Sequence, residues 1–276
     1  METLVIKNNL LTGGSGKLYR DVIVNAGTLL CLDFSNRGCL TNDNLSTVRD
    51  LAKEAKDDLL IPNNIQFKVT DRGTVPPLTT KKGYPIVDLG SYSATANDSG
   101  LQVKGIDEYL FAKQPHSLMV LWLDCAGTSR SNLGSDNIIS SSDSNAENIR
   151  LTGGAGATVS LRFGGIGFVN YNVGTNVSQL AVEYIDSTQP LKLYVNGRYY
   201  GLSSANGYGF KAATSNPLNI GAKTPLRNTT INLYRPDIFD LTKYGKTALE
   251  VVERDYNYVN ALGEFEGITK RPYANI

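Results

Sequence analysis

Apolar and polar side chains alternate one by one in several short stretches of the chain, at residues 65–70, 159–163 and 180–184. Successive side chains of a β-strand point to opposite faces, so this alternation is typical of a strand with one face on a core. Each stretch therefore predicts a half-buried antiparallel strand.

The segment around Asn196-Gly197 predicts a β-hairpin. Residues 191–195 and 198–200 favour strands, and Asn-Gly is the dipeptide best suited to a two-residue type I′ turn. The cross-strand pairs expected from this closure are Val195 with Arg198, Tyr194 with Tyr199 and Leu193 with Tyr200. This pairing puts the Tyr194 and Tyr199 rings together on the face opposite Leu193, which we take as a candidate outer face.

Two further strands differ in their patterns. Residues 118–123 are apolar without alternation, so we expect a central strand covered on one face by the opposite sheet and on the other by a loop, helix or neighbouring subunit. Residues 231–234 alternate, with Asn232 and Tyr234 outward. We expect this strand to end at the Arg235-Pro236 step, because proline has no ladder donor.

Only two segments have helical spacing. One is 45–59, after an Asn44 cap. The other begins at a capping box formed by Thr247 and Glu250 and carries an apolar stripe. The residues of that stripe are Leu249, Val252, Tyr256 and Val259.

These patterns predict an all-β fold: a two-sheet antiparallel sandwich with two short peripheral helices. We expect an N-terminal arm at 1–20, a sandwich domain at 21–265 and a C-terminal tail at 266–276. In the arm, Leu4, Val5 and Ile6 form a short apolar segment before a glycine-rich hinge, and we predict that they dock on a partner.

Charge is nearly balanced, with 27 basic and 26 acidic residues and a net charge of +1. No overall field draws the chain to nucleic acid or to an anionic membrane, so neither is a predicted partner. The first residues lack the apolar segment of a signal peptide. We therefore expect the protein to be made in a host cytoplasm.

Candidate chemistry is sparse. His116 is the only histidine and the three cysteines lack C-x-x-C spacing, which argues against a zinc site and a catalytic triad. We predict no cofactor, although the alternating Asp143, Asn145 and Glu147 leave a loop-bound calcium open.

A glycoside hydrolase or lyase is the enzymatic alternative. Glu183 and Asp186 are three residues apart on one predicted strand and point to opposite faces, so they do not form a carboxylate pair. Pairs formed between different strands stay open. We predict that the protein is not an enzyme.

The hairpin sequence LKLYVNG at 191–197, followed by PLNIG at 217–221, resembles the core of laminin-G-like and concanavalin A-like domains. The resemblance extends from about residue 20 to 265 and includes Trp122 in the central strand. It implies a jelly-roll of two antiparallel sheets that binds sugars or proteins.

Members of this family without secretion signals resemble bacteriophage virion components. The resemblance therefore implies a virion structural or decoration protein that contacts itself, as a homo-oligomer, and other virion proteins. The alternative is a lectin-like module for a host-surface glycan, in which aromatic faces stack on sugar rings. Its candidate ligand residues are Tyr194, Tyr199, Tyr200, Asn206 and Tyr208. These tyrosines alternatively cover the sheet or line a subunit contact.

Overall fold

The computed structural model describes residues 21, 23–34, 39, 48–61, 65–68, 78–81, 84–88, 100–125, 137–141, 149–153, 158–164, 169–173, 176–206, 209–212, 218–220 and 231–262. The predicted arm and tail lie outside these residues. The described strands are β1 (Thr28–Cys31), β2 (Ile65–Lys68), β3 (Leu78–Lys81), β4 (Tyr84–Asp88), β5 (Gly100–Val103), β6 (Ser117–Cys125), β7 (Asn137–Ser140), β8 (Ile149–Gly153), β9 (Thr158–Phe163), β10 (Val169–Asn172), β11 (Ser178–Tyr184), β12 (Pro190–Val195), β13 (Arg198–Asn206), β14 (Leu218–Ile220) and β15 (Ile231–Asp240). The described helices are α2 (Lys53–Asp58), α3 (Ile106–Lys113), α4 (Leu241–Tyr244) and α5 (Ala248–Leu262).

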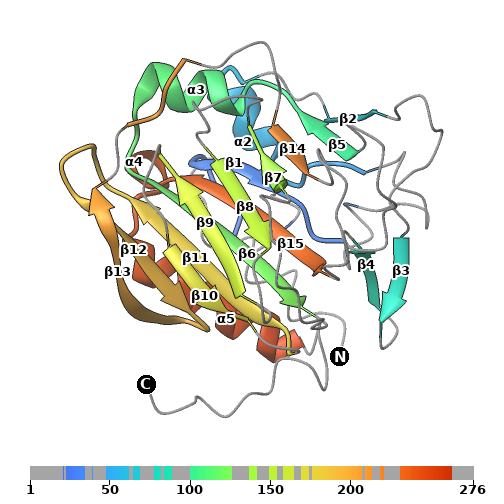
Figure 1. The fold of residues 1–276 in the computed structure, drawn as a ribbon. Coiled ribbons are helices and arrows are strands. Elements are labelled where there is room, and N and C mark those ends of the chain that lie inside the picture. Colours follow the sequence, from blue (N-terminus) through green and yellow to red (C-terminus); the bar gives the residue numbers. More distant parts are fainter. Residues whose placement is uncertain are drawn as a thin grey trace.

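Two antiparallel sheets make up the fold (Figure 1). The first has the order β13-β12-β11-β6-β15-β4-β3, with β1 also paired to β15. The second has the order β10-β9-β8-β7-β14-β5-β2. The predicted all-β, antiparallel class is therefore confirmed.

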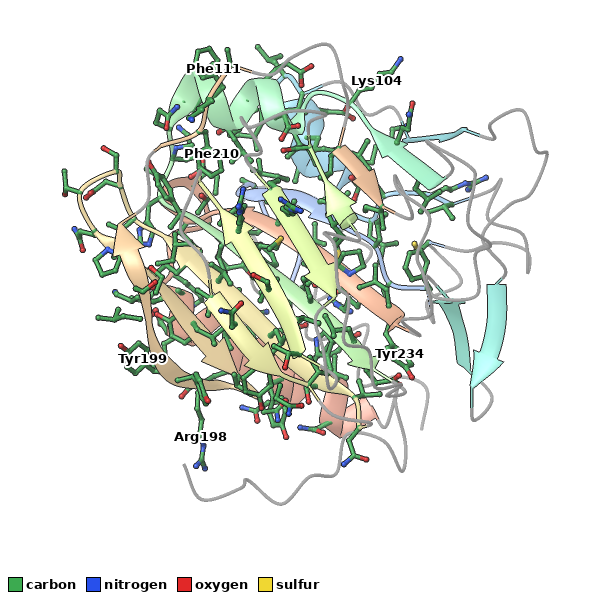
Figure 2. The ribbon with its side chains drawn as sticks, in the orientation of Figure 1. Lys104, Phe111, Arg198, Tyr199, Phe210 and Tyr234 are labelled. Carbon is green, nitrogen blue, oxygen red and sulfur yellow. The ribbon has the colours of Figure 1, made fainter. Side chains whose placement is uncertain are left out.

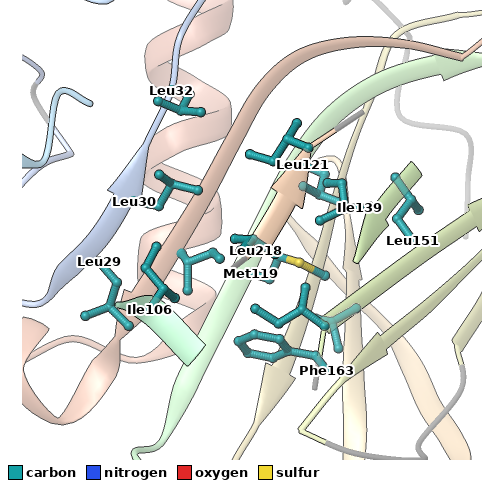
Figure 3. Packing of buried hydrophobic residues seen from close by; sticks show 14 of the residues in the cluster. Leu29, Leu30, Leu32, Ile106, Met119, Leu121, Ile139, Leu151, Phe163 and Leu218 are labelled. Atoms are coloured by element: carbon teal, nitrogen blue, oxygen red, sulfur yellow. The ribbon is translucent and has the colours of Figure 1, made fainter. Parts of the chain in front are cut away.

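Side chains from both sheets meet in one apolar core. Strand β9 shows the predicted alternation, since Val159, Leu161 and Phe163 are buried and the residues between them are half-buried. Met119 and Leu121 of the first sheet lie in the same core as Phe163 of the second (Figure 3). The two sheets are thus layers of a sandwich.

The predicted central strand is confirmed in β6, which is the middle strand of the first sheet's order. Met119 and Leu121 face the second sheet, whereas Val120 and Trp122 lie in a second apolar cluster with residues of α5. Trp122 stacks on Tyr256 of α5, with ring centroids 5.8 Å apart and planes 7° apart. The cover on the outer face is therefore a helix of the same chain.

The same helix corrects the prediction for β11. Leu180 and Val182 point into the sandwich core as expected, but Ala181 on the other face is also buried, against the α5 cluster. The alternation correctly assigned the faces. It carried no information on what covers the second face.

Strand β15 continues past the step where we expected it to end. The Pro236 carbonyl accepts a hydrogen bond from the Leu32 N–H at 3.1 Å, just beyond the end of β1. The N–H and C=O groups of one residue in an antiparallel strand point to the same side of the strand. The backbone of Pro236 points away from β6, so its missing N–H removes no hydrogen bond from the ladder between β15 and β6. Tyr234 was expected to face solvent but is fully buried, and its hydroxyl donates to Asp124 Oδ2 at 2.6 Å.

The first predicted helix is shorter than expected. Residues 48–51 are not helical, and the Leu51 N–H donates to the Cys31 carbonyl at 2.9 Å. The Asp50 carboxylate accepts from the N–H groups of Cys31 and Ala52 at 3.0 and 2.8 Å. Asp50 therefore ties this segment to β1, and α2 begins only at Lys53. Asn44 lies outside the described residues.

The second predicted helix is confirmed as α5, with its capping box. The Thr247 N–H donates to Glu250 Oε2 at 2.9 Å, and the Glu250 N–H donates to Thr247 Oγ1 at 3.3 Å. Leu249 was expected in the buried stripe, but it is 39% exposed, and Val251 is buried instead. Helices α3 and α4 were not predicted, since both are short and α3 buries little beyond Ile106, Asp107 and Leu110.

A buried ion cluster connects the start of the described chain, the first sheet and α5. Arg235 donates from Nη1 to Asp21 Oδ2 at 3.1 Å and to Asp33 Oδ2 at 3.0 Å, and from Nε to Asp237 Oδ2 at 2.8 Å. Asp255 Oδ1 of α5 lies 3.5 Å from Arg235 Nε. The Asp255 carboxylate also accepts from the indole of Trp122 at 2.7 Å. All five charged side chains are fully buried.

Candidate functional site

The predicted hairpin is confirmed as β12 and β13, joined by Asn196 and Gly197, whose φ angles are 48° and 81°. Backbone and side chain of Gln179 on the neighbouring strand hold this turn. The Asn196 N–H donates to the Gln179 carbonyl at 3.0 Å, the Gln179 N–H to Asn196 Oδ1 at 2.9 Å, and the Gly197 N–H to Gln179 Oε1 at 2.8 Å. These three hydrogen bonds therefore fix the conformation of the hairpin turn at the end of the first sheet.

The register of the hairpin was predicted only in part. Val195 pairs with Arg198 and Tyr194 with Tyr199, as expected, but Leu193 pairs with Gly201. The predicted Leu193–Tyr200 pair is wrong, because a β-bulge makes Tyr200 an extra residue on β13.

The bulge changes which side chains share a face. Lys192 pairs with Leu202 two positions beyond the Tyr194–Tyr199 pair, so Leu202 and Tyr199 both lie on the outer face of the first sheet. Tyr199 is 49% exposed and Leu202 is 57% exposed. We call this exposed part of the hairpin, Tyr199 and Leu202 with Lys192, the hairpin face.

Tyr199 rests on Tyr194. The two ring centroids lie 5.9 Å apart with planes at 73°, an edge-to-face arrangement. Tyr194 itself is only 5% exposed, and its hydroxyl donates to Glu183 Oε2 at 2.5 Å. Burial and this carboxylate together raise the pKa of Tyr194. Tyr194 thus supports the exposed ring from beneath, whereas Tyr199 presents its ring at the outer edge of the molecule (Figure 2).

Glu183 of β11 is the centre of a polar cluster under the hairpin face. Its Oε1 lies 2.6 Å from His116 Nε2, and its Oε2 lies 3.5 Å from Lys192 Nζ, besides the bond from Tyr194. Burial alone would raise the pKa of Glu183, but hydrogen bonds from His116 and Tyr194 and the charge of Lys192 hold that pKa below its ordinary value. The carboxylate is therefore ionised, with both oxygens occupied.

The polar cluster presents two hydrogen-bonding side chains to solvent. Glu183 is only 4% exposed, whereas the side chains of His116 and Lys192 are 36% and 35% exposed. Asp186 does not join Glu183, since it is exposed and accepts bonds from Thr188 and Gln189 in its own turn. Hydrogen bonding and positioning are the chemistry that this arrangement offers.

Tyr200 belongs to a different environment from Tyr199. It is 45% exposed and packs edge to face on Tyr171 of β10, with ring centroids 5.2 Å apart and planes at 90°.

The side chains of the other predicted site residues lie outside the part of the chain that the structure describes. Asn206 ends β13 with its side chain outside the described set, and Tyr208, the calcium-loop candidates and the arm residues Leu4, Val5 and Ile6 lie outside it altogether.

Sequence reasoning missed three residues of this region in this role. His116 was interpreted as a residue at a strand entry, Glu183 only as a candidate for catalysis, and Tyr171 was not singled out. Each comes from a different strand or loop from the hairpin. The one available signal was Glu183, a charged residue within an otherwise uncharged strand.

Metal and membrane features were also sought within the described residues. They contain no group of three or more His, Cys, Asp and Glu side chains suited to a metal ion. None of their helices is long and apolar enough to span a membrane. Cys31 and Cys39 are free and buried, and burial raises the pKa of both thiols.

No family model and no curated protein matches the chain. Solved structures nevertheless share its fold. The binding domain of Paraclostridial Mosquitocidal Protein 1 matches with a TM-score of 0.58 and 13% identity, over 84% of this chain and 52% of that one. A botulinum neurotoxin type C structure, from work on cell entry through two ganglioside molecules, gives 0.58 and 13%, over 84% and 51%. The binding domain of botulinum neurotoxin DC in complex with SialylT gives 0.57 and 12%, over 86% and 52%.

The chain thus spans about half the length of the solved structures that it matches. At this level of identity the likeness shows the fold alone. The fold occurs in binding domains of toxins, and the function of this chain must be argued from its own residues.

Proposed function

We propose that this protein is a non-catalytic, lectin-like module that binds a glycan at the hairpin face, with the sugar ring stacked on Tyr199. The observation that carries the proposal is the half-exposed Tyr199 ring held on a buried, hydrogen-bonded Tyr194. A ring fixed in advance loses little entropy on binding, which favours recognition of a flat apolar sugar face.

The polar side chains around Glu183 also support a glycan site at Tyr199. Lys192 is paired with Leu202 on the hairpin face, and both it and His116 contact Glu183 while remaining about one-third exposed. These two side chains are suited to form hydrogen bonds with sugar hydroxyls. The toxin binding domains of the same fold, including one in complex with SialylT and one whose cell entry depends on gangliosides, are consistent with glycan recognition.

We also infer that the sheets have the jelly-roll connectivity of concanavalin A-like and laminin-G-like domains. Support comes from the two stacked antiparallel sheets and from the hairpin motif. The ionised Glu183, with both oxygens engaged, supports a module without catalytic function.

A glycan array tests the proposal. We expect binding to a defined glycan that Tyr199→Ala weakens about tenfold, equivalent to about 1.4 kcal/mol, and that Tyr199→Phe largely retains. Leu249→Ala, at an exposed apolar position on α5, is the matched control and should bind like the wild type. An array without binding, or affinity unaffected by Tyr199→Ala, would refute the proposal.

A virion role, with virion localisation, self-association and other virion proteins as partners, remains a prediction that rests on the resemblance of the sequence. It is tested by deletion of residues 2–16, which should leave a folded sandwich that no longer joins its assembly. Normal incorporation of the truncated chain would rule out docking through Leu4, Val5 and Ile6.

A further inference from the structure

Strand β13 carries two exposed tyrosines in succession that lie on different sides of it. Tyr199 packs on Tyr194, in the apolar cluster between the first sheet and α5. Tyr200 packs on Tyr171 of β10, which belongs to the second sheet. This division follows from strand geometry, in which successive side chains point to opposite faces, and the bulge at Tyr200 puts Leu202 rather than Gly201 on the face of Tyr199.

Both rings are supported by contact with a second tyrosine. Each is nearly half exposed, at 49% and 45%, and each meets a second tyrosine ring edge to face at a centroid distance between 5 and 6 Å. Edge-to-face contact fixes a ring while leaving one of its faces free. The strand therefore offers two prepared aromatic platforms.

The sheet edge is open at the position that follows Tyr200. Within the described chain, β13 pairs only with β12 and is the end strand of the first sheet. The next residue is Gly201, and apart from its chain neighbours no described atom lies within 4 Å of the position that a Cβ would take there. A ligand that crosses the edge of the sheet next to Tyr200 meets no side chain at this point.

We propose that the glycan bound at the hairpin face is an extended oligosaccharide that crosses β13 and stacks on both Tyr199 and Tyr200. This inference rests on the proposed function, since Tyr199 is its first platform. A second stacked unit adds a contact without a second cost of association, so affinity rises with chain length. A terminal monosaccharide reaches only one of the two rings.

The test is an array of immobilised mono- to hexasaccharides of glucose, galactose, mannose, N-acetylglucosamine and sialylated lactose, followed by calorimetry with the best hexasaccharide and its monosaccharide unit. We expect about tenfold tighter binding of the longer ligand. Tyr200→Ala should remove that gain, whereas Tyr200→Phe should keep it.

A second variant obstructs the path rather than removing a platform. Gly201→Val places a branched side chain in the open space, and valine suits a strand. It should weaken hexasaccharide binding to the level of the monosaccharide, with an unchanged circular dichroism spectrum confirming the fold. Leu249→Ala serves as the control for both variants.

The outcomes separate the two proposals. Binding that depends on Tyr199 but is equal for all chain lengths, or is unaffected by both Tyr200→Ala and Gly201→Val, overturns the extended-ligand inference and leaves the proposed function standing. Absence of binding at every length refutes the proposed function and this inference with it.

Discussion

Replacing Arg235 by methionine should strongly destabilise the fold, because it removes the cation from among four buried carboxylates. Arg235 donates directly to Asp237, Asp21 and Asp33 and lies 3.5 Å from Asp255. Breaking one buried ion pair costs about 3–5 kcal/mol, since the remaining charge has no water around it. With three carboxylates losing a donor at once, we expect the upper end of that range, about 5 kcal/mol. Domains are typically stable by about 5–15 kcal/mol, so the variant should be close to unfolding at neutral pH.

Urea unfolding followed by tryptophan fluorescence measures this loss. Trp122 is the only tryptophan, and it both stacks on Tyr256 and donates to Asp255 at the edge of the cluster. The matched control is Arg198→Met at the exposed hairpin end, which should change the free energy of unfolding by less than about 0.5 kcal/mol.

Lowering the pH should reduce the loss of stability that Arg235→Met causes. Near pH 4 the carboxylates that have lost Arg235 can bind protons, and neutral carboxyl groups cost less to bury than ions. The difference in stability between variant and wild type should therefore shrink from pH 7 to pH 4. A loss below about 1 kcal/mol at pH 7 with an unchanged m value would contradict the assumption that Arg235 is a buried cation whose aspartate partners are closed to water.

Two further predictions follow from buried or constrained positions. Burial and the neighbouring Asp255 raise the pKa of Asp237 well above its ordinary value despite Arg235, so between the unfolded and folded pKa values the folded state binds a proton that the unfolded state has released. The associated stability is fully present below about pH 4 and is lost as the pH rises through the raised value, and Asp237→Asn should flatten the dependence in denaturant titrations between pH 5 and 8. Gly197→Ala should cost about 1–2 kcal/mol, because Gly197 has a φ of 81° and a Cβ there would lie 3.2 Å from the Tyr256 ring, whereas Gly201→Ala should be nearly neutral. Equal effects of the two glycine substitutions on the urea midpoint would show that the turn conformation is not constrained.

Much of the sandwich could be predicted because its strands follow period-two alternation. The pattern of β9 and the apolar run of β6 gave the correct faces and the correct central strand. The errors lie where a local signal competes with a tertiary contact. Pro236 stays inside β15 because its backbone faces Leu32 and not the ladder with β6. Helix α2 starts late because Asp50 bonds to β1. Neither partner is visible from local sequence.

The candidate site could likewise be predicted only in part. The turn at Asn196-Gly197 and the Tyr194–Tyr199 pair follow from hairpin closure and could be predicted. The bulge could not, because nothing in the residues around Tyr200 distinguishes a shifted register from a regular one. The bonds of His116 and Glu183 join residues 67 positions apart, so they depend on how β6 and β11 pair.

Helix α5 determines how much of the outer face is left for binding. It covers Val120, Trp122 and Tyr194 in one apolar cluster, and Tyr256 reaches the hairpin turn at Gly197. Alternation alone would have left the outer faces of β11 and β12 open to solvent. Because the helix covers these faces, the large exposed apolar side chains of the first sheet, among those whose burial the structure describes, lie on the end strand β13, at Tyr199, Tyr200 and Leu202. The same packing that buries Tyr194 and connects it to Glu183 therefore also fixes the exposed ring above it, and a binding surface at this edge is a consequence of how the sandwich core is closed.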